Sequence, residues 1–569
     1  MVHRTETPGA PQDRPTAARW CLVPLVAAVA IYLPALANEF LVDDIHVVAG
    51  NPLVCGDALD AARILGSDYW AGVLQNDDTL YRPLTILLHA ATCQAAGPDP
   101  AFHRAVSLVF HGLNAVLLFF LLRRLLPPGR RGWAGSVLGS VAFAVHPLNS
   151  EAVLFVANRS DLVAAASCLG VALLVLAYVF RRVPTGRVDR TGGATLFAIA
   201  AVQAVGVFSK ESAVAAPVVA GMVTLLAWRL MPAPSRGRFP WAQTALALAP
   251  AAVAIAAYLA ARVVVLGALY HGAGFAPLDN PLVLVPSVVR VRTAIEVLGR
   301  YLGLFVAPIH LSADYSLAQI LPVTSWLAPG FLAGAAACLA LVAAGLLALR
   351  RLPIVTLGVA WYLVALFPAS NLAFPIGTIM GERLTYLPDI GLFIALAGAG
   401  VAVVSRLSPR VTRGFVLAVV AVVVELAVLT GLRGQETATN CGLFDRTAEA
   451  SPDSAKAQFG VGICALEKDD MTRAITAFDR ALRLYPDYGD AMVQVAQALE
   501  RAGYIQEAID RLGTFLETHP TATGVRFTLA KVLARDGRRD QARAVLATLI
   551  QRFPGRADFQ EALRHLDEP

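Results

Sequence analysis

The chain has 569 residues, of which 57% are hydrophobic and only 15% are charged. Soluble globular domains carry about 25% charged residues, so this composition excludes a soluble globular protein and indicates a polytopic membrane protein. The net charge of +6 does not predict a nucleic-acid partner, because much of the basic excess lies between hydrophobic segments, where it sets membrane topology.

Eleven hydrophobic segments follow one another in the first three quarters of the chain and predict an all-α membrane domain over 20–432. They cover residues 20–37, 101–125, 133–146, 161–180, 194–208, 212–230, 241–266, 328–349, 353–368, 389–404 and 414–432. A further segment, 286–307, carries Arg290, Arg292 and Glu296. Each charge at mid-membrane costs about 2.5–3.5 kcal/mol, so we expect this segment to lie at the membrane interface.

Basic residues at the segment ends predict the orientation of the chain. Arg123-Arg124 and the other basic clusters all fall on the cytoplasmic side only if the number of crossings is odd. The N-terminal tail, 1–19, is then cytoplasmic, whereas the loop 38–100 and the C-terminal part lie outside. We expect the first segment to be retained rather than cleaved as a signal, because no small-residue cleavage site follows it.

The polar C-terminal part, 437–569, carries a sequence repeat. Prolines recur with a spacing of 34 residues, small residues keep the same register, and Gly503 and Gly537 mark the turns between paired helices. This pattern is typical of tetratricopeptide repeats and predicts an α-solenoid. We place the repeats at 452–485, 486–519 and 520–553, preceded by one more helix over 437–450 and followed by a tail from residue 567. Such a solenoid offers a groove for protein segments, and the alternative is a spacer or a stabilising cap.

Two adjacent aspartates, Asp43 and Asp44, follow the first hydrophobic segment on the outer side. Carboxylates at the mouth of a membrane helix suit an enzyme that needs a base facing a lipid-borne substrate. They equally suit a solvated turn that stops the helix, and the two residues alone leave both interpretations open. Further along, Tyr81-Arg82 precedes an apolar stretch over 83–96, which is too short to cross a membrane and is expected to form a helix at its surface.

Further polar residues collect at the outer ends of the hydrophobic segments. Ionisable groups at membrane depth are functional candidates; cations can hold a lipid phosphate while a carboxylate takes a proton from a hydroxyl. A plain ion pair formed by Lys210 or Glu211, and a helix cap by His146, are the structural alternatives. The candidates for binding a donor phosphate or substrate are Tyr81, Arg82, His146, Glu151, Arg159, Lys210, Glu211, Glu382, Arg383 and Tyr386.

Taken together, from about Trp20 to Leu566, the chain resembles the transmembrane and tetratricopeptide-repeat O-mannosyltransferase family, within the GT-C superfamily of glycosyltransferases that use polyprenyl-phosphate sugars. No motif is specific by itself. The specificity lies in the order of the motifs, in their common position on the outer side and in the repeats that follow them. The motifs are Phe40-Leu41-Val42-Asp43-Asp44, Tyr81-Arg82-Pro83, His146-Pro147 with Glu151, Asn158-Arg159-Ser160-Asp161, Ser209-Lys210-Glu211 and Glu382-Arg383-Leu384-Thr385-Tyr386-Leu387-Pro388.

The resemblance implies a GT-C-like membrane domain and an inverting transfer of a sugar, mannose or another hexose, to a hydroxyl acceptor. It implies that Asp43 or Asp44 is the base, that Arg82, Lys210 and Arg383 hold the phosphate of a lipid-linked donor, and that Tyr386 lines the pocket. The donor would be an undecaprenyl- or dolichyl-phosphate sugar, and the acceptor a protein Ser or Thr or a glycan. The second aspartate could instead orient the acceptor or bind a divalent metal.

The Ala, Val and Arg bias indicates a bacterial protein, hence an integral protein of the inner (cytoplasmic) membrane with its repeats in the periplasm or outside. Seven cysteines are present. Cys55, Cys93, Cys441 and Cys464 fall on the oxidising side; a Cys441–Cys464 bridge is one option among the pairings that sequence leaves open. No Cys/His pattern suggests zinc.

Two other functions compete with a glycosyltransferase. A transporter would carry its charges within the spans, whereas here they gather at the outer ends. A membrane scaffold whose repeats assemble envelope complexes would function after charge neutralisation but not after loss of residues 452–554.

Overall fold

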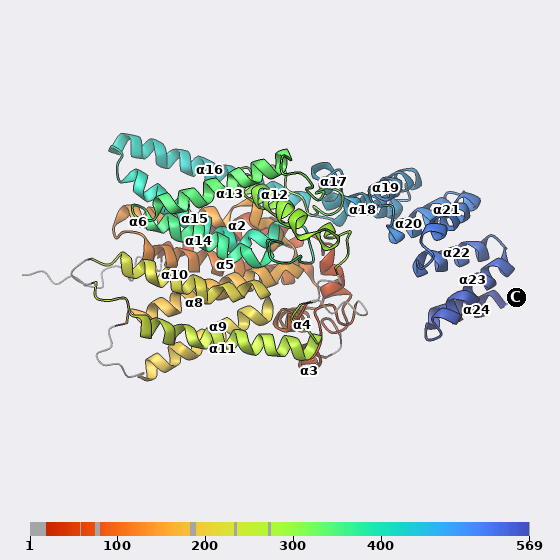
Figure 1. The fold of residues 1–569 in the computed structure, drawn as a ribbon, viewed down its shortest axis with the longest axis horizontal. Coiled ribbons are helices and arrows are strands. Elements are labelled where there is room, and N and C mark those ends of the chain that lie inside the picture. Colours follow the sequence, from red (N-terminus) through yellow and green to blue (C-terminus); the bar gives the residue numbers. More distant parts are fainter. Residues whose placement is uncertain are drawn as a thin grey trace, which may run out of the picture.

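The computed structural model describes residues 19–56, 58–73, 80–181, 189–232, 236–270 and 275–567. Within these residues the regular elements are all helices, arranged as a bundle from one end of which a row of helix pairs extends (Figure 1). The all-α prediction is therefore confirmed. The predicted cytoplasmic tail, apart from residue 19, lies outside the described residues.

Each of the eleven predicted segments contains a helix of the bundle. Eight helical segments are long and apolar enough to cross a membrane, or nine if the bent pair Arg130–Ala144 and Pro147–Leu154 is one span; Leu22–Ala37 and Pro353–Ala369 are apolar but shorter. The chain is thus an integral membrane protein. The bundle helices are α2 (Leu22–Tyr32), α5 (Pro100–Leu125), α6 (Arg130–Ala144), α8 (Arg159–Val179), α9 (Arg190–Ser209), α10 (Ala216–Arg229), α11 (Trp241–Leu266), α13 (Pro329–Ala348), α14 (Pro353–Leu366), α15 (Tyr386–Val404) and α16 (Pro409–Glu436).

Two shorter or more polar helices lie beside these spans. Helix α4 (Pro83–Ala96) begins with a proline at its first position and ends at Gly97, whose φ of 68° suits glycine. Helix α12 (Ser287–Val306) packs against α13 and is not among the helices apolar enough to cross.

Close packing of small residues makes the core of the bundle rigid. Helices α14 and α15 cross where Gly358 meets Gly391: a Cβ on Gly358 would lie 2.3 Å from the Gly391 carbonyl oxygen. No larger residue fits at this crossing without moving a backbone. The crossing fixes α15, whose N-terminal end carries the Glu382-Arg383 motif.

The repeat domain consists of eight helices. They are α17 (Asn440–Ala450), α18 (Ala455–Glu467), α19 (Met471–Leu484), α20 (Gly489–Arg501), α21 (Ile505–Thr518), α22 (Thr523–Arg535), α23 (Arg539–Arg552) and α24 (Ala557–Asp567). Ala474, Ala508 and Ala542 are fully buried at the helix crossings, as the repeat pattern predicts.

Helix α16 connects the far end of the bundle to the repeat domain (Figure 1). Its 28 residues span about 42 Å. Arg410 at its start and α17 beyond its end therefore lie at opposite ends of the bundle.

The repeat domain is docked on the bundle rather than tethered to it. Ala318 N–H donates to the Asp453 carbonyl at 2.8 Å, and Ala455 N–H donates to the Leu317 carbonyl at 3.0 Å. These bonds join the loop before α13 to the segment between α17 and α18.

Two disulfides lie at this end of the molecule. Cys441–Cys464 joins α17 to α18, which is the pairing that the sequence left as one option, and Cys55–Cys93 joins the first outer loop to α4. Both disulfides therefore lie at the end of the bundle on which the repeat domain is docked.

Candidate functional site

The two adjacent aspartates lie in different environments. Asp43 is exposed, whereas Asp44 is fully buried. The Asp44 carboxylate accepts the Ala157 N–H at 2.7 Å and the Leu41 N–H at 3.1 Å. Burial raises the pKa of Asp44 to about 6, against these N–H bonds and the charge of Arg104, which lower it. Asp44 is therefore a buried anchor of the loop, and Asp43 is the aspartate that solvent can reach.

The residue before this pair has an unusual backbone. Val42 has a φ of 41°, a left-handed conformation that is costly for a β-branched side chain. Such conformations persist only where surrounding contacts impose them, and they cluster at functional sites. The loop that carries Asp43 is thus held rather than free.

Arg104, a residue that the sequence analysis did not single out, holds the start of this loop. Its buried guanidinium donates to the carbonyls of Leu36 at 2.8 Å, Asn38 at 2.7 Å and Glu39 at 2.7 Å. The sequence indicates Arg104 as a functional candidate, because it is an ionisable residue inside the predicted hydrophobic segment 101–125. Asn440, which contacts the same loop from α17, carried no comparable signal.

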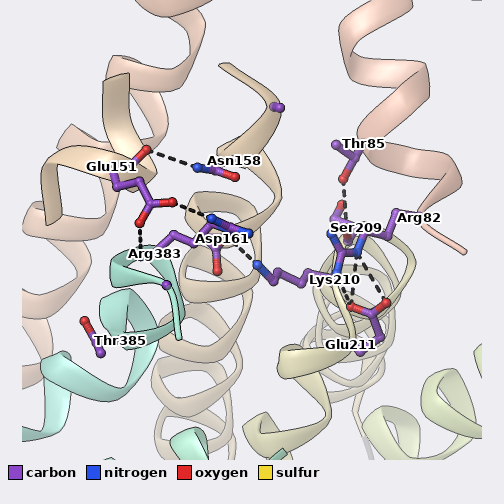
Figure 2. Close-up of polar contacts among 12 residues, drawn as sticks. Arg82, Thr85, Glu151, Asn158, Asp161, Ser209, Lys210, Glu211, Arg383 and Thr385 are labelled. Carbon is purple, nitrogen blue, oxygen red and sulfur yellow. Dashed lines mark hydrogen bonds and ion pairs between the residues drawn. The ribbon is translucent and has the colours of Figure 1, made fainter. Parts of the chain in front are cut away.

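Three ion pairs lie beside one another in the bundle (Figure 2). Arg383 Nη1 lies 2.5 Å from Glu151 Oε1, and the Arg383 N–H also donates to Glu151 at 2.8 Å. Lys210 Nζ lies 2.5 Å from Asp161 Oδ2. The Arg82 guanidinium holds the Glu211 carboxylate with contacts of 2.9–3.3 Å.

The chain folds so that elements far apart in sequence supply this cluster. Lys210 has an extended backbone between α9 and the 3-10 helix η5 (Glu211–Ala215), which lets its side chain turn toward α8. Thr85 Oγ1 donates to the Ser209 carbonyl at 2.9 Å and fixes the start of α4, with Arg82, against the end of α9. Arg383 lies on the 3-10 helix η10 (Glu382–Thr385) before α15.

The cluster and Asp43 form one electrostatic unit. The charges of Arg82 and Arg383 both act on Lys210, and the charge of Asp43 acts on Arg383. Burial raises the pKa of Tyr69, whose ring lies under the Arg82 guanidinium at 5.4 Å, and the charges of Asp43 and Asp44 raise it further while Arg82 and Arg383 lower it. The three predicted phosphate-binding cations and the exposed aspartate are therefore brought together.

Access differs among these cations. The side chain of Arg383 is 28% exposed and that of Arg82 is 15% exposed, whereas that of Lys210 is only 7% exposed. Arg383 is thus the cation most open to a ligand, and Lys210 supplies positive charge from behind it.

Five other candidates make polar contacts within the protein, and their predicted contact with a donor stays a prediction. Tyr81 donates to the Leu65 carbonyl, His146 contacts the Phe305 carbonyl and caps the turn before α7 (Ser150–Leu154), and Arg159 is fully buried against the His103 carbonyl. The Tyr386 hydroxyl contacts His111 Nδ1 at 2.7 Å inside the core, and buried Glu382 accepts from the Ser312 N–H and the Tyr315 hydroxyl. Most polar atoms of these side chains are hydrogen-bonded within the protein, whereas Oε2 of Glu382 is buried without a partner among the described residues.

The described residues do not form a divalent-metal cage at this site. The three carboxylates of the cluster already pair with arginine or lysine side chains of the protein; they belong to Glu151, Asp161 and Glu211. In the described part of the chain, the groups of three candidate ligands are built on the two disulfides, with His103 or Glu467 as the third member. Disulfide-bonded cysteines have no free thiolate to bind a metal, so neither group is a metal site while its disulfide is intact.

The fold and site define a class of protein: a polytopic membrane protein with an exposed carboxylate and a cationic cluster at the end from which a helical repeat domain extends. Family models of the tetratricopeptide repeat match residues 442–489 and 499–566. The predicted repeats are confirmed.

Over most of its length the chain is similar to animal protein O-mannosyl-transferases. It is 24% identical over 505 residues to TMTC3 of Mus musculus, covering 86% of this chain and 53% of that protein. It is 25% identical over 476 residues to F38B6.6 of Caenorhabditis elegans, covering 82% and 63%. These matches confirm the resemblance to the transmembrane and tetratricopeptide-repeat O-mannosyltransferase family. The chain spans only about half to three fifths of the length of these relatives.

Among solved structures, the chain is similar to ArnT from Cupriavidus metallidurans bound to undecaprenyl phosphate. The identity is 15% and the TM-score is 0.39, over 87% of this chain and 80% of that one.

Proposed function

We propose that this protein is a membrane glycosyltransferase that moves a sugar, mannose or another hexose, from a polyprenyl-phosphate carrier to a hydroxyl group on the outer face. The observation that carries the proposal is an exposed carboxylate, Asp43, whose charge acts on Arg383 within a cluster of three cations. The names of the similar proteins, protein O-mannosyl-transferases, support the reaction class.

In the proposed reaction, Asp43 accepts the proton of the acceptor hydroxyl while the oxygen of that hydroxyl bonds to the anomeric carbon of the sugar. The bond from that carbon to the phosphate oxygen breaks, and the electron pair leaves with the polyprenyl phosphate. Because the displacement is single and from the opposite face, the anomeric configuration inverts. A positioned general base contributes about 10²–10⁴-fold to such a step.

The leaving phosphate gains charge in this step, so nearby cations favour it. Arg383 would bind it directly, since its guanidinium is the most open and can pair with phosphate through two N–H groups. Arg82 and Lys210 would add positive charge from the side. Glu211 also lies 3.8 Å from Arg262, which adds a fourth cation beside the three of the cluster.

The repeats are on the same side as Asp43, so they could present a protein acceptor to it. We place the site and the repeats in the periplasm or outside a bacterial inner membrane, with an undecaprenyl- or dolichyl-phosphate sugar as donor and a GT-C-like membrane domain. The two disulfides at this end of the molecule favour an oxidising compartment.

The direct test uses the full-length protein in lipid nanodiscs with polyprenyl-phosphate hexoses, a Ser/Thr peptide mixture and envelope glycans as acceptors. We expect hexose transfer by the wild type and its loss in Asp43→Asn. Mass spectrometry of exported glycoproteins and glycans with and without the gene identifies the natural acceptor class. Full function of charge-neutralised variants, together with loss of function on removal of the repeats, would favour a scaffold instead.

A further inference from the structure

Asn440, the first residue of α17, contacts the loop that carries Asp43. Its side-chain amide donates through Nδ2 to the Phe40 carbonyl at 2.7 Å and accepts the Val42 N–H through Oδ1 at 2.8 Å. One side chain thus occupies both a backbone acceptor and a backbone donor, two residues apart, immediately before Asp43.

Neighbouring bonds join the same two segments. Glu39 N–H donates to the Ala438 carbonyl at 3.0 Å, and Asn38 Nδ2 donates to the Gly434 carbonyl at 2.7 Å. The loop before Asp43 is therefore paired along its length with the turn between α16 and α17. Asn440 is the last contact of this pairing and the nearest to Asp43.

The contact acts where the backbone most needs support. Val42 has left-handed φ, which an isolated valine avoids. Without the bond to its N–H, the loop can relax to extended or right-handed conformations, and the direction of the Asp43 side chain changes with it. The bonds from Arg104 end at Glu39, so they do not hold Val42 directly.

We infer that Asn440 is a positioning residue, through which the repeat domain holds the loop of the base in its reactive conformation. The inference rests on the proposed function. It means that the repeat domain completes the site, so that a partner which shifts α17 also shifts Asp43.

The test compares Asn440→Ala with Thr439→Ala in the full-length protein. The Thr439 hydroxyl accepts the Gly442 N–H as the cap of α17, so Thr439→Ala weakens the same helix without removing a bond to the loop. We expect kcat for hexose transfer to fall about tenfold or more in Asn440→Ala, with KM for the lipid donor within about twofold, since the donor cations do not contact Asn440. Thr439→Ala should keep nearly wild-type kcat.

Hydrogen exchange gives a second readout that needs no activity. The amides of residues 39–44 should exchange faster in Asn440→Ala than in the wild type. In Thr439→Ala their exchange rates should equal those of the wild type. Unchanged exchange in Asn440→Ala, or an equal loss of kcat in both variants, would overturn the inference. If the wild type transfers no sugar, the proposed function fails, and the exchange comparison still decides whether Asn440 holds the loop.

Discussion

Isosteric amide substitutions at the two adjacent aspartates should have unequal effects, because one carboxylate is exposed and the other is a buried anchor. Asp43→Asn removes the base while keeping the size of the side chain. The loss of a general base costs about 10²–10⁴-fold in rate, equivalent to about 3–5 kcal/mol of barrier. Since Asp43 is exposed, its replacement should leave the melting temperature unchanged.

At Asp44 two opposing terms nearly cancel. An asparagine can accept only one of the two N–H groups that the carboxylate holds, and leaving the other buried N–H without an acceptor costs about 1–3 kcal/mol. However, the rise of the Asp44 pKa from 3.8 to about 6, which already includes the N–H bonds to the carboxylate, corresponds to about 3 kcal/mol by which the folded protein disfavours the charged form, and a neutral amide avoids this cost. We therefore expect Asp44→Asn to change stability by less than about 1.5 kcal/mol and kcat by less than about tenfold.

The assay measures hexose transfer from a polyprenyl-phosphate sugar in nanodiscs, together with the melting temperature of each variant. The ratio of the two kcat losses is the informative quantity, because it does not depend on the absolute rate. A loss of a hundredfold in Asp44→Asn with less than tenfold in Asp43→Asn would reverse the assignment. Full activity in both variants and in the double variant would refute a carboxylate base altogether.

Three further predictions follow from the same geometry. Arg383→Lys keeps the charge but loses the fork of N–H groups, so we expect KM for the lipid donor to rise about tenfold or more with a smaller change in kcat; an unchanged KM would argue against a phosphate contact. Tyr386→Phe leaves the buried Nδ1 of His111 without its partner and should cost about 1–3 kcal/mol of stability without changing kcat, whereas a selective loss of kcat would place the Tyr386 hydroxyl in the site. Because the Asp44 pKa is raised in the folded protein, its contribution to stability is fully present below about pH 4 and is lost as the pH rises through about 6; melting curves of wild type and Asp44→Asn should diverge over this range, and parallel pH dependence would contradict it.

The fold could be predicted from the sequence because its signals are local. Each membrane helix is a continuous apolar run, and each repeat carries its own register of small residues. The candidate site could also be proposed from the sequence, since Asp43, Arg82, Lys210 and Arg383 are charges at the ends of apolar segments. Membrane insertion tolerates such charges mainly where they are paired or functional.

The roles within the site could not be predicted, because they depend on contacts between distant parts of the chain. Asp43 and Asp44 are indistinguishable as letters; what separates them is the Ala157 N–H, which turns one into an anchor. Tyr386 belongs to one of the motifs that resemble the family's functional motifs, yet its hydroxyl is hydrogen-bonded to His111 in the core. Burial and pairing partners decide these roles, and neither is written in local sequence.

The loop of Asp43 is held from three sides, by the backbone before α8, by Arg104 of α5 and by Asn440 of α17. This arrangement bears on how the repeat domain should be studied. Removing the repeats with α17 would delete both the groove proposed to bind the acceptor and the support of the proposed base, so loss of activity after truncation does not distinguish the two roles. Point variants can, because Asn440→Ala disturbs the loop while leaving the groove intact, and substitutions on the groove far from α17 do the reverse. If Asn440→Ala lowers kcat and the groove substitutions raise KM for a protein acceptor, the repeat domain both supports the base and binds the acceptor.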